Sequence, residues 1–264
     1  MLRTFPIIFA YCSSGFDLFH VLIVNADDWG RSVAETDSAL RCYQAGRITS
    51  VSAMVFMGDS MRAAKLAKDH QLDDVGLHLN FSEEFTDVSC PEALKEHHRR
   101  IVRFLRRNKY AQLLYNPLLR QAFACSYRAQ IEEFSRLFDK LPSHVDGHHH
   151  MHLCANFLLS KRMPAGTRVR RNFSFSPGEK SWLNRAYRYL VDRWLARRYR
   201  LPDYFFDLIQ CIEGKKLDRV AALAKSNNVE LMTHPNISAE KAFLMSDEFQ
   251  VILQDLEIGG YALV

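Results

Sequence analysis

Histidine and aspartate residues form four short clusters in this chain of 264 residues, and each cluster follows an apolar run. The clusters are an aspartate pair at Asp27 and Asp28, a histidine at His78, a histidine-rich stretch at 144–152, and a histidine at His234. Imidazole nitrogens and carboxylate oxygens are suitable ligands for one divalent metal ion. A further carboxylate and a further histidine remain for general base and general acid roles. The clusters therefore predict metal-assisted hydrolysis.

The histidine-rich stretch is the strongest of these signals, because five of the eleven histidines fall within nine residues. If the stretch is extended, alternation puts His148, His150 and His152 on one side and His149 on the other. The other clusters are weaker signals when taken alone. An aspartate pair often forms a turn or a helix cap, and a histidine between leucines is often a hydrogen-bonded core residue.

The elements that must position these side chains follow a βα pattern from residue 21 onward. Short apolar, β-branched runs predict strands at 21–25, 48–55, 75–80, 144–146, 168–171, 206–211, 229–233 and 261–264. Apolar residues at helical spacing predict helices at 35–45, 59–70, 128–140, 216–226 and 247–257. The four clusters lie at carboxyl ends of predicted strands.

Seven or eight βα units in about 245 residues predict one (β/α) barrel of parallel strands, with a doubly wound open sheet as the alternative. No linker rich in proline, glycine or serine divides the chain, so residues 21–264 form one predicted domain. Residues 91–127 are predicted to be a helical insertion between the third and fourth strands. Residues 1–20 read as an N-terminal extension of uncertain status, because their apolar run is interrupted by Pro6 and lacks a signal cleavage site.

The sequence resembles the YdjC/ChbG-type carbohydrate deacetylases, a branch of the glycoside hydrolase/deacetylase barrels. Five segments carry the resemblance in order: LIVNADDWG, GRITSVSAM, VGLHLNF, PSHVDGHHHMH and ELMTHP. The resemblance implies an irregular barrel and a deacetylase activity. It also implies that Asp28, His78 and His148 hold one divalent ion, Mg²⁺ or Zn²⁺.

The same resemblance implies that Asp27 is the catalytic base and His234 is the acid or oxyanion-side partner. Four further residues are expected around the ligands or beside the substrate: His144, Asp146, His150 and His152. The chain departs from the usual family pattern at 81–85 and 153–155. Both departures fall in loops around the predicted mouth, so they bear on which substrate is bound.

The expected function is removal of the acetyl group from an N-acetylated sugar in an oligosaccharide or a lipid-linked glycan. Two alternatives stay open at this point. One is a metal-assisted hydrolase of another amide or of a phosphoester on the same scaffold. The other is a non-catalytic basic binding protein.

The positive charge of the chain is unevenly distributed. The whole sequence holds 35 Lys and Arg against 30 Asp and Glu, yet residues 161–200 hold twelve basic and two acidic residues. Within this stretch, 181–200 has a helical pattern with apolar residues on one face: Leu183, Tyr187, Leu190, Val191 and Trp194. The helix could be an outer barrel helix with a solvated arginine face, or a surface that contacts an anionic membrane or glycolipid. No nucleic-acid partner is expected, because no recognised binding module surrounds the stretch.

The six cysteines are widely spaced and form no C-x-x-C pair, which is typical of a reduced, intracellular protein. A cytoplasmic location is expected, with the inner membrane surface as the place of any peripheral contact. The sequence contains no run of eighteen uncharged apolar residues, so no membrane-spanning helix is predicted.

Overall fold

The structure is a computed structural model, and it describes residues 20–264. The predicted extension at 1–20 therefore lies outside the described residues, apart from its last residue. The strands are β1 (Leu22–Trp29), β2 (Ser50–Ala53), β3 (Val75–Leu79), β4 (Val145–Gly147), β5 (Tyr204–Asp207) and β6 (Val229–Thr233). The α-helices are α1 (Val33–Gln44), α2 (Ser60–Asp69), α3 (Glu92–Leu105), α4 (Arg120–Phe138), α5 (Ala155–Leu158), α6 (Trp182–Leu195), α7 (Leu208–Glu213), α8 (Leu217–Ala224), α9 (Ser238–Leu244) and α10 (Asp247–Gln254). Short 3₁₀ segments are η1 (Ala111–Leu113), η2 (Pro117–Leu119), η3 (His148–Leu153) and η4 (Tyr261–Leu263).

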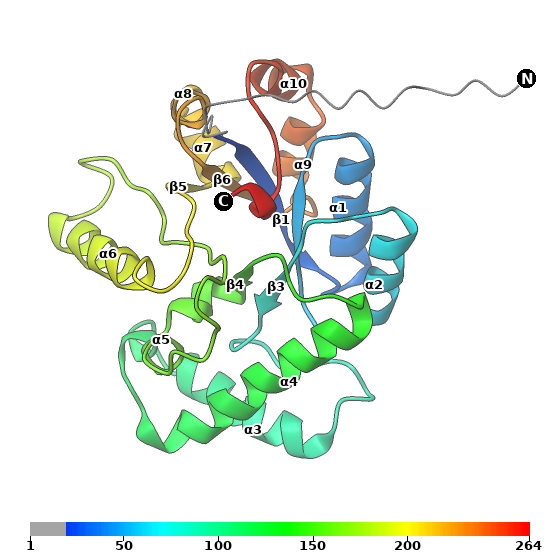
Figure 1. The fold of residues 1–264 in the computed structure, drawn as a ribbon, viewed down its shortest axis with the longest axis vertical. Coiled ribbons are helices and arrows are strands. Elements are labelled where there is room, and N and C mark those ends of the chain that lie inside the picture. The colour runs from blue at the N-terminus through cyan, green and yellow to red at the C-terminus, as the bar shows by residue number, and fades with distance from the viewer. Residues whose placement is uncertain (1–19) are drawn as a thin grey trace, which may run out of the picture.

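The six strands form one parallel sheet in the order β4-β3-β2-β1-β6-β5. Strands that neighbour each other in the sheet are consecutive in the chain, except that β6 lies beside β1. This cyclic order is that of a curled barrel, and it rules out the doubly wound alternative. Helices surround the curled sheet, as Figure 1 shows. The predicted irregular (β/α) barrel is confirmed, with six strands among the described residues instead of seven or eight.

The segment 168–174 spans the gap between the two edge strands. Its beginning pairs with β4, where Val145 N donates to Arg168 O at 2.9 Å and Arg170 N donates to Val145 O at 3.2 Å. Its end pairs with β5, where Ser174 N donates to Phe205 O at 2.9 Å. The predicted strand at 168–171 is thus only a pair of isolated bridges, because its backbone crosses from one edge to the other.

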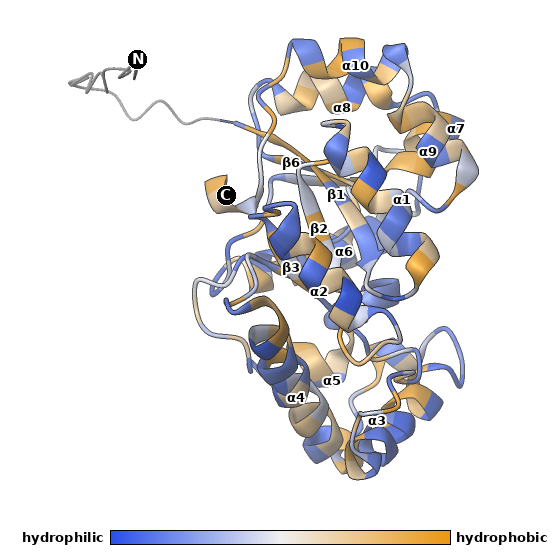
Figure 2. Ribbon diagram, turned by 90° about the vertical axis from the view of Figure 1, so that its right-hand side faces the viewer, coloured by the Kyte–Doolittle hydropathy of each residue, from blue (hydrophilic) through white to orange (hydrophobic). Residues whose placement is uncertain are grey.

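Strand burial explains the apolar runs of the sequence. All eight residues of β1 are buried, as are all five of β3 and of β6, because one side faces the helices and the other faces the barrel interior. Figure 2 shows mixed hydrophilic and hydrophobic colouring along helices such as α3 and α10, which bury only one face. Polar residues on the buried strands must therefore find partners inside the barrel.

Two other strand predictions are wrong at their ends. The predicted strand at 206–211 stops at Asp207, because the Asp207 side chain accepts a hydrogen bond from Gln210 N and starts α7. The predicted strand at 261–264 is the 3₁₀ segment η4. There Tyr261 turns inward and its hydroxyl donates to Glu230 inside the barrel.

The predicted helical insertion at 91–127 comprises α3, η1, η2 and the first turns of α4. Helix α4 begins at Arg120, earlier than the predicted 128, and is continuous to Phe138. The side-chain amide of Gln130 in α4 bonds both backbone polar groups of Asn80, the residue after β3. Its side-chain oxygen accepts from Asn80 N at 2.8 Å and its amide donates to Asn80 O at 2.9 Å. Helix α4 therefore supports the loop that follows β3.

His98 of α3 supports the same loop. Its Nε2 lies 2.7 Å from Glu83 O, its Nδ1 lies 3.1 Å from Ser126 Oγ, and its ring stacks on Phe85 at 3.7 Å between centroids. Burial lowers the pKa of His98 to about 4, and the hydrogen bond to Glu83 O offsets this only in part. His98 is thus a neutral structural residue at physiological pH.

In residues 20–264, no helix is both long and apolar enough to span a membrane. The five cysteines of this part, Cys42, Cys90, Cys125, Cys154 and Cys211, are free thiols.

The depressed pKa of His98 predicts a pH-dependent stability. In the unfolded chain His98 is protonated below about pH 6.5, whereas in the folded chain it is protonated only below about pH 4. The free energy of unfolding therefore falls as the pH falls from about 6.5 to about 4. The contribution lost between pH 7 and pH 5 is about 2 kcal/mol. The His98→Gln variant should show a shallower decline in urea unfolding free energy over this range. His70→Gln, an exposed control, should keep the decline of the parent; equal slopes for His98→Gln and the parent would contradict this account.

Candidate metal centre and active site

The carboxyl end of β1 presents the aspartate pair. Asp28 adopts φ 65°, a left-handed conformation that aspartate tolerates better than most residues. The register of β1 against β2 shifts between Ala26 and Trp29, so the strand is irregular at the pair. Backbone strain of this kind often occurs at functional sites. As a result, the two neighbouring carboxylates take different directions and meet different partners.

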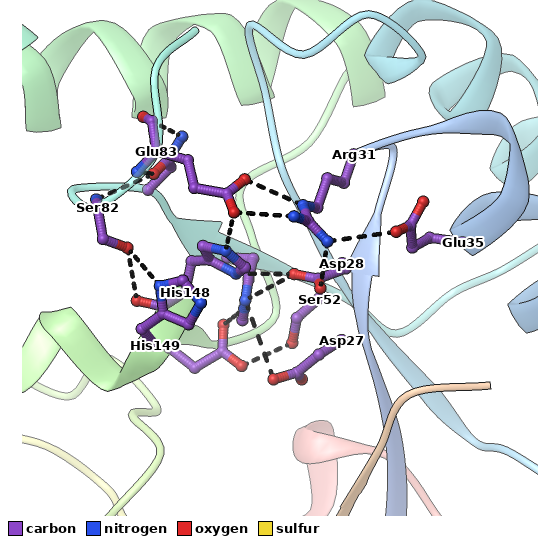
Figure 3. Close-up of polar contacts among 12 residues, drawn as sticks. Asp27, Asp28, Arg31, Glu35, Ser52, Ser82, Glu83, His148 and His149 are labelled. Carbon is purple, nitrogen blue, oxygen red and sulfur yellow. Dashed lines mark hydrogen bonds and ion pairs between the residues drawn. The ribbon is translucent and has the colours of Figure 1, made fainter. Parts of the chain in front are cut away.

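Asp28, His78 and His148 converge at one point, as predicted. Asp28 Oδ1 lies 2.9 Å from His148 Nδ1 and 3.3 Å from His78 Nε2, and all three side chains are buried. One ligand atom from each residue lies within 4.8 Å of the other two. The side chains come from β1, β3 and the start of η3, and Figure 3 shows those of Asp28 and His148 pointing toward one another.

The donor set fits a bound cation. Asp28 Oδ1 is buried and has no well-formed hydrogen bond, although two imidazole nitrogens lie nearby. A buried carboxylate oxygen without a hydrogen bond is costly unless another group satisfies it. Burial alone would raise the pKa of Asp28, but His148 and His78 lower it further than burial raises it. An ionised carboxylate between two imidazoles is a suitable ligand set for a divalent metal.

Asp146 fixes the orientation of His78. His78 Nδ1 lies 3.0 Å from Asp146 Oδ1, which leaves Nε2 facing Asp28. Strand register explains this contact, because His78 and Asp146 are paired residues of β3 and β4. Burial opposes a charge on His78, yet Asp146 and Asp27 raise its pKa well above the ordinary value. A carboxylate behind a metal-binding histidine sets both the ring orientation and the nitrogen that is free to bind.

His144 lies one step farther from the centre and is fully buried. Its Nε2 lies 3.0 Å from Ser52 Oγ, and Ser52 donates to Asp146 Oδ2 at 2.9 Å. Its ring stacks on Tyr261 and packs over Gly76, where an added Cβ would lie 2.2 Å from His144 Cε1. His144 is therefore linked to Asp146 through Ser52 and has no exposed surface.

Arg170 is one of two residues of the site that the sequence did not predict. It is fully buried and donates to both oxygens of Asp27, at 2.8 Å to Oδ2 and 2.6 Å to Oδ1. It also lies 2.7 Å from Asp146 Oδ2 and 2.8 Å, through Nε, from Glu230 Oε1. In the sequence it was one of the twelve basic residues at 161–200, and only its place in a predicted strand hinted that it points inward.

The histidine-rich stretch is not extended, so the predicted alternation is wrong. Residues 148–153 form η3, and His149 and His150 both have left-handed backbones. This turn sends the side chains to different places. His148 enters the cluster, His150 packs against Phe173 at 4.6 Å between centroids, and His152 Nε2 lies 3.1 Å from Arg170 O.

Glu83 is a second residue that the sequence analysis missed. Its Oε1 lies 3.2 Å from His148 Nε2, on the side of the ring opposite Asp28. Arg31 binds both Glu83 oxygens, at 2.8 and 3.0 Å, and lies 3.6 Å from Asp28 Oδ2 (Figure 3). Asn80 accepts a hydrogen bond from Glu83 N at 2.9 Å. Glu83 lies in the 81–85 loop, whose departure from the family pattern was the only signal.

His234 follows β6 and is half-buried. Thr233 pairs with Ala26, so the next residue of each strand brings His234 level with Asp27 at the same end of the barrel. Glu240 accepts from His234 N at 2.7 Å, and its Oε1 lies 3.9 Å from His234 Nδ1. These contacts fix the backbone at His234, and its ring is partly exposed and lies outside the cluster of Asp28, His78 and His148.

A cavity of about 420 Å³ lies beside this centre. Its walls are aromatic and basic: His149, His150, Phe173, Phe205, Lys109, Tyr110, Tyr187, Arg171 and Arg188. Aromatic faces with polar side chains between them can bind the apolar faces and hydroxyl groups of a sugar.

Comparisons with known proteins agree with this arrangement. A family model described as YdjC-like protein matches residues 21–257. A chitooligosaccharide deacetylase of Proteus mirabilis is 28% identical over 236 residues, which are 82% of this chain and 81% of that protein. One of Serratia marcescens is 30% identical over 133 residues, which are 50% of this chain and 51% of that protein, so this match spans about half of the relative.

A solved structure shares the fold. It is a protein from Enterococcus faecalis V583 provisionally assigned to cellobiose-phosphate cleavage, with a TM-score of 0.64 and 18% identity. The superposition covers 92% of this chain and 98% of that one. The family match over most of the chain confirms the resemblance drawn from the motifs: this chain belongs to the YdjC-like protein family.

Proposed function

We propose that this protein is a metal-dependent hydrolase that removes the acetyl group from an N-acetylated sugar of an oligosaccharide or lipid-linked glycan. The observation that carries the proposal is the convergence of Asp28, His78 and His148, with Asp27 on the same strand end. Relatives named chitooligosaccharide deacetylase support the substrate class. A cytoplasmic location stays a prediction from the spacing of the cysteines.

Asp28, His78 and His148 would hold the cation. When bound, a divalent ion polarises the amide carbonyl and activates a water molecule for attack. Two nitrogens and one carboxylate oxygen are a ligand set that suits Zn²⁺, and Mg²⁺ prefers a larger share of oxygen ligands. We therefore favour Zn²⁺ over Mg²⁺ as the ion that this site takes.

Asp27 would accept the proton of the attacking water. Its Oδ1 accepts from Asn25 and Arg170, but Oδ2 accepts only from Arg170 and lies 3.9 Å from His78 Nε2, on the cluster side. Arg170 thus fixes the Asp27 carboxylate and leaves a lone pair on the oxygen nearer the ligands. A base held in one orientation loses little entropy in the reaction.

His234 would protonate the departing nitrogen. Water adds to the amide carbon, the C–N bond breaks, and the products are acetate and a free amino sugar. Because β6 lies beside β1, His234 reaches the open end of the barrel from the strand next to the base. The base and the acid would then come from two neighbouring strand ends.

The proposed ligand set makes a prediction about metal content. His148→Ala should bind less than a tenth of the Zn²⁺ bound by the parent, because it removes one of three ligand atoms. His149→Ala, the matched control, should keep stoichiometric metal. Metal analysis after dialysis measures both. Loss of metal in both variants would instead favour the neighbouring group Glu83, His148 and His149.

The proposed base makes a prediction about turnover. Asp27→Asn should keep metal and fold but lose about 10²- to 10⁴-fold in the rate of acetate release, because the amide cannot take the proton. Release from N-acetylated chitooligosaccharides measures the rate, and metal analysis of the same sample shows that the ligands are intact. A rate within a few-fold of the parent would remove Asp27 from the role of base.

Glu83 should tune metal affinity through His148. Replacing it by Gln removes the negative charge that lies 3.2 Å from His148 Nε2, so the Kd for Zn²⁺ should rise about 10- to 100-fold. Competition with a chelating dye measures this Kd. Glu84→Gln, the exposed neighbour in the same loop, should leave the Kd unchanged; an equal effect of both variants would point to bulk charge.

A further inference from the structure

Helix α6 presents its apolar side chains to solvent. Trp182, Leu183 and Leu190 are 73%, 63% and 64% exposed, and Tyr187 and Tyr189 are also exposed. The outer-helix interpretation expected Leu183 and Leu190 to face the barrel. Only Leu195, in the last turn, is a buried apolar residue of this helix.

Much of the side of α6 that faces the protein is held by polar contacts, beside the apolar packing of its last turns. Asp192 accepts from Asn172 N at 3.0 Å and pairs with Arg171 at 3.0 Å, and Arg188 Nη1 lies 3.4 Å from Asn172 Oδ1. Among residues 20–264, no other helix or strand packs extensively along α6. Figure 1 shows it at the edge of the molecule, apart from the helices that cover the sheet. The first half of α6 thus turns its apolar side chains outward, whereas Val191, Trp194 and Leu195 in the second half pack on the core.

A second exposed apolar segment lies across the cavity from α6. In 110–118, Tyr110 is 59% and Leu118 is 80% exposed, and Leu113, Leu114 and Tyr115 are exposed as well. Lys109, Tyr110 and Leu113 line the same 420 Å³ cavity as Asn184, Tyr187 and Arg188 of α6. The two segments therefore flank one opening, and we call them together the apolar rim.

Charge surrounds the apolar rim. Residues 97–131 hold eight Lys and Arg and no Asp or Glu, and 161–200 hold twelve basic and two acidic residues. The rest of the chain holds fifteen basic and twenty-eight acidic residues. Two copies of such a basic face would repel each other, whereas anionic lipid headgroups would neutralise it. Exposed Trp, Tyr and Leu beside Arg are typical of a surface that enters the headgroup and acyl boundary.

We propose that the apolar rim, α6 with 110–118, docks on an anionic lipid bilayer. The lipid headgroups bind the arginines, and Trp182, Leu183, Leu190 and Leu118 enter the boundary below them. Docking brings the mouth of the cavity beside His149 and His150 to the bilayer surface. The inference stands on surface chemistry alone, so it does not depend on the proposed deacetylase activity.

Vesicle binding by the full chain tests the proposal. At physiological salt the protein should sediment with vesicles of 70% phosphatidylcholine and 30% phosphatidylglycerol and stay free of pure phosphatidylcholine vesicles. The emission of Trp182 should shift to the blue on binding, and Trp182→Phe should remove that shift, since Trp29 is buried and Trp194 is half-buried.

Variants separate the apolar and the charged contributions. Leu183→Ser with Leu190→Ser should weaken binding at least about tenfold. Arg185→Gln, Arg193→Gln and Arg197→Gln together should weaken it about a hundredfold. Val88→Ser, a control at another exposed apolar residue, should bind as the parent does. Circular dichroism and metal content should be unchanged in all of them.

Three results would overturn the proposal. One is no binding of the parent to phosphatidylglycerol vesicles. Another is a dimer in light scattering that Leu183→Ser with Leu190→Ser dissociates, which would assign the rim to a second copy of this chain. The third is a combination of two observations: the double variant still binds vesicles, and the protein binds a single-stranded polynucleotide equally well. This combination would indicate a general polyanion-binding surface.

Discussion

One buried guanidinium, that of Arg170, is the interaction on which the rest of the site depends. It binds Asp27 of β1, Asp146 of β4 and Glu230 of β6, so it ties three strands together inside the barrel. A charge buried this deeply is tolerated only when its partners are in place. Arg170 belongs to the segment that spans the gap between β4 and β5. The segment that closes the barrel therefore also carries the side chain that aligns the carboxylates. Asp146 then orients His78, and Asp27 keeps a free lone pair on Oδ2, the oxygen on the cluster side.

A second layer of support comes from outside the barrel. Helices α3 and α4 place His98 and Gln130 against the loop after β3, and this loop carries Glu83 to the outer side of His148. The two imidazoles of the cluster thus each have a carboxylate behind them, one from a strand and one from a loop. The strand partner follows from the register of β3 against β4. The loop partner depends on the 81–85 segment, where this chain departs from the usual family pattern.

The sequence predicted what depends on local pattern. Buried parallel strands read as apolar runs, and the polar residues that end them, Asp28 and His78 among them, were found because carboxyl ends of barrel strands converge. The sequence-based predictions failed where the backbone conformation of a few residues, or contacts with residues distant in sequence, determine the structure. His149 and His150 have left-handed backbones, so the stretch is not extended and its side chains do not alternate. Asp207 caps α7, so the chain is helical where the sequence predicted the end of a strand. Arg170 was out of reach because all three of its carboxylate partners are distant in sequence.

The central claim is that a single divalent ion is held by Asp28, His78 and His148 in a site that the Arg170 network pre-forms. Anomalous diffraction at the zinc edge, from crystals of the full chain soaked in Zn²⁺, tests it most directly. The account predicts one strong peak about 2.0 to 2.2 Å from one oxygen of Asp28 and one nitrogen of each histidine, with Arg170 still bound to Asp27. A peak bound by Glu83, His148 and His149 alone, or no peak at the barrel end, would contradict it.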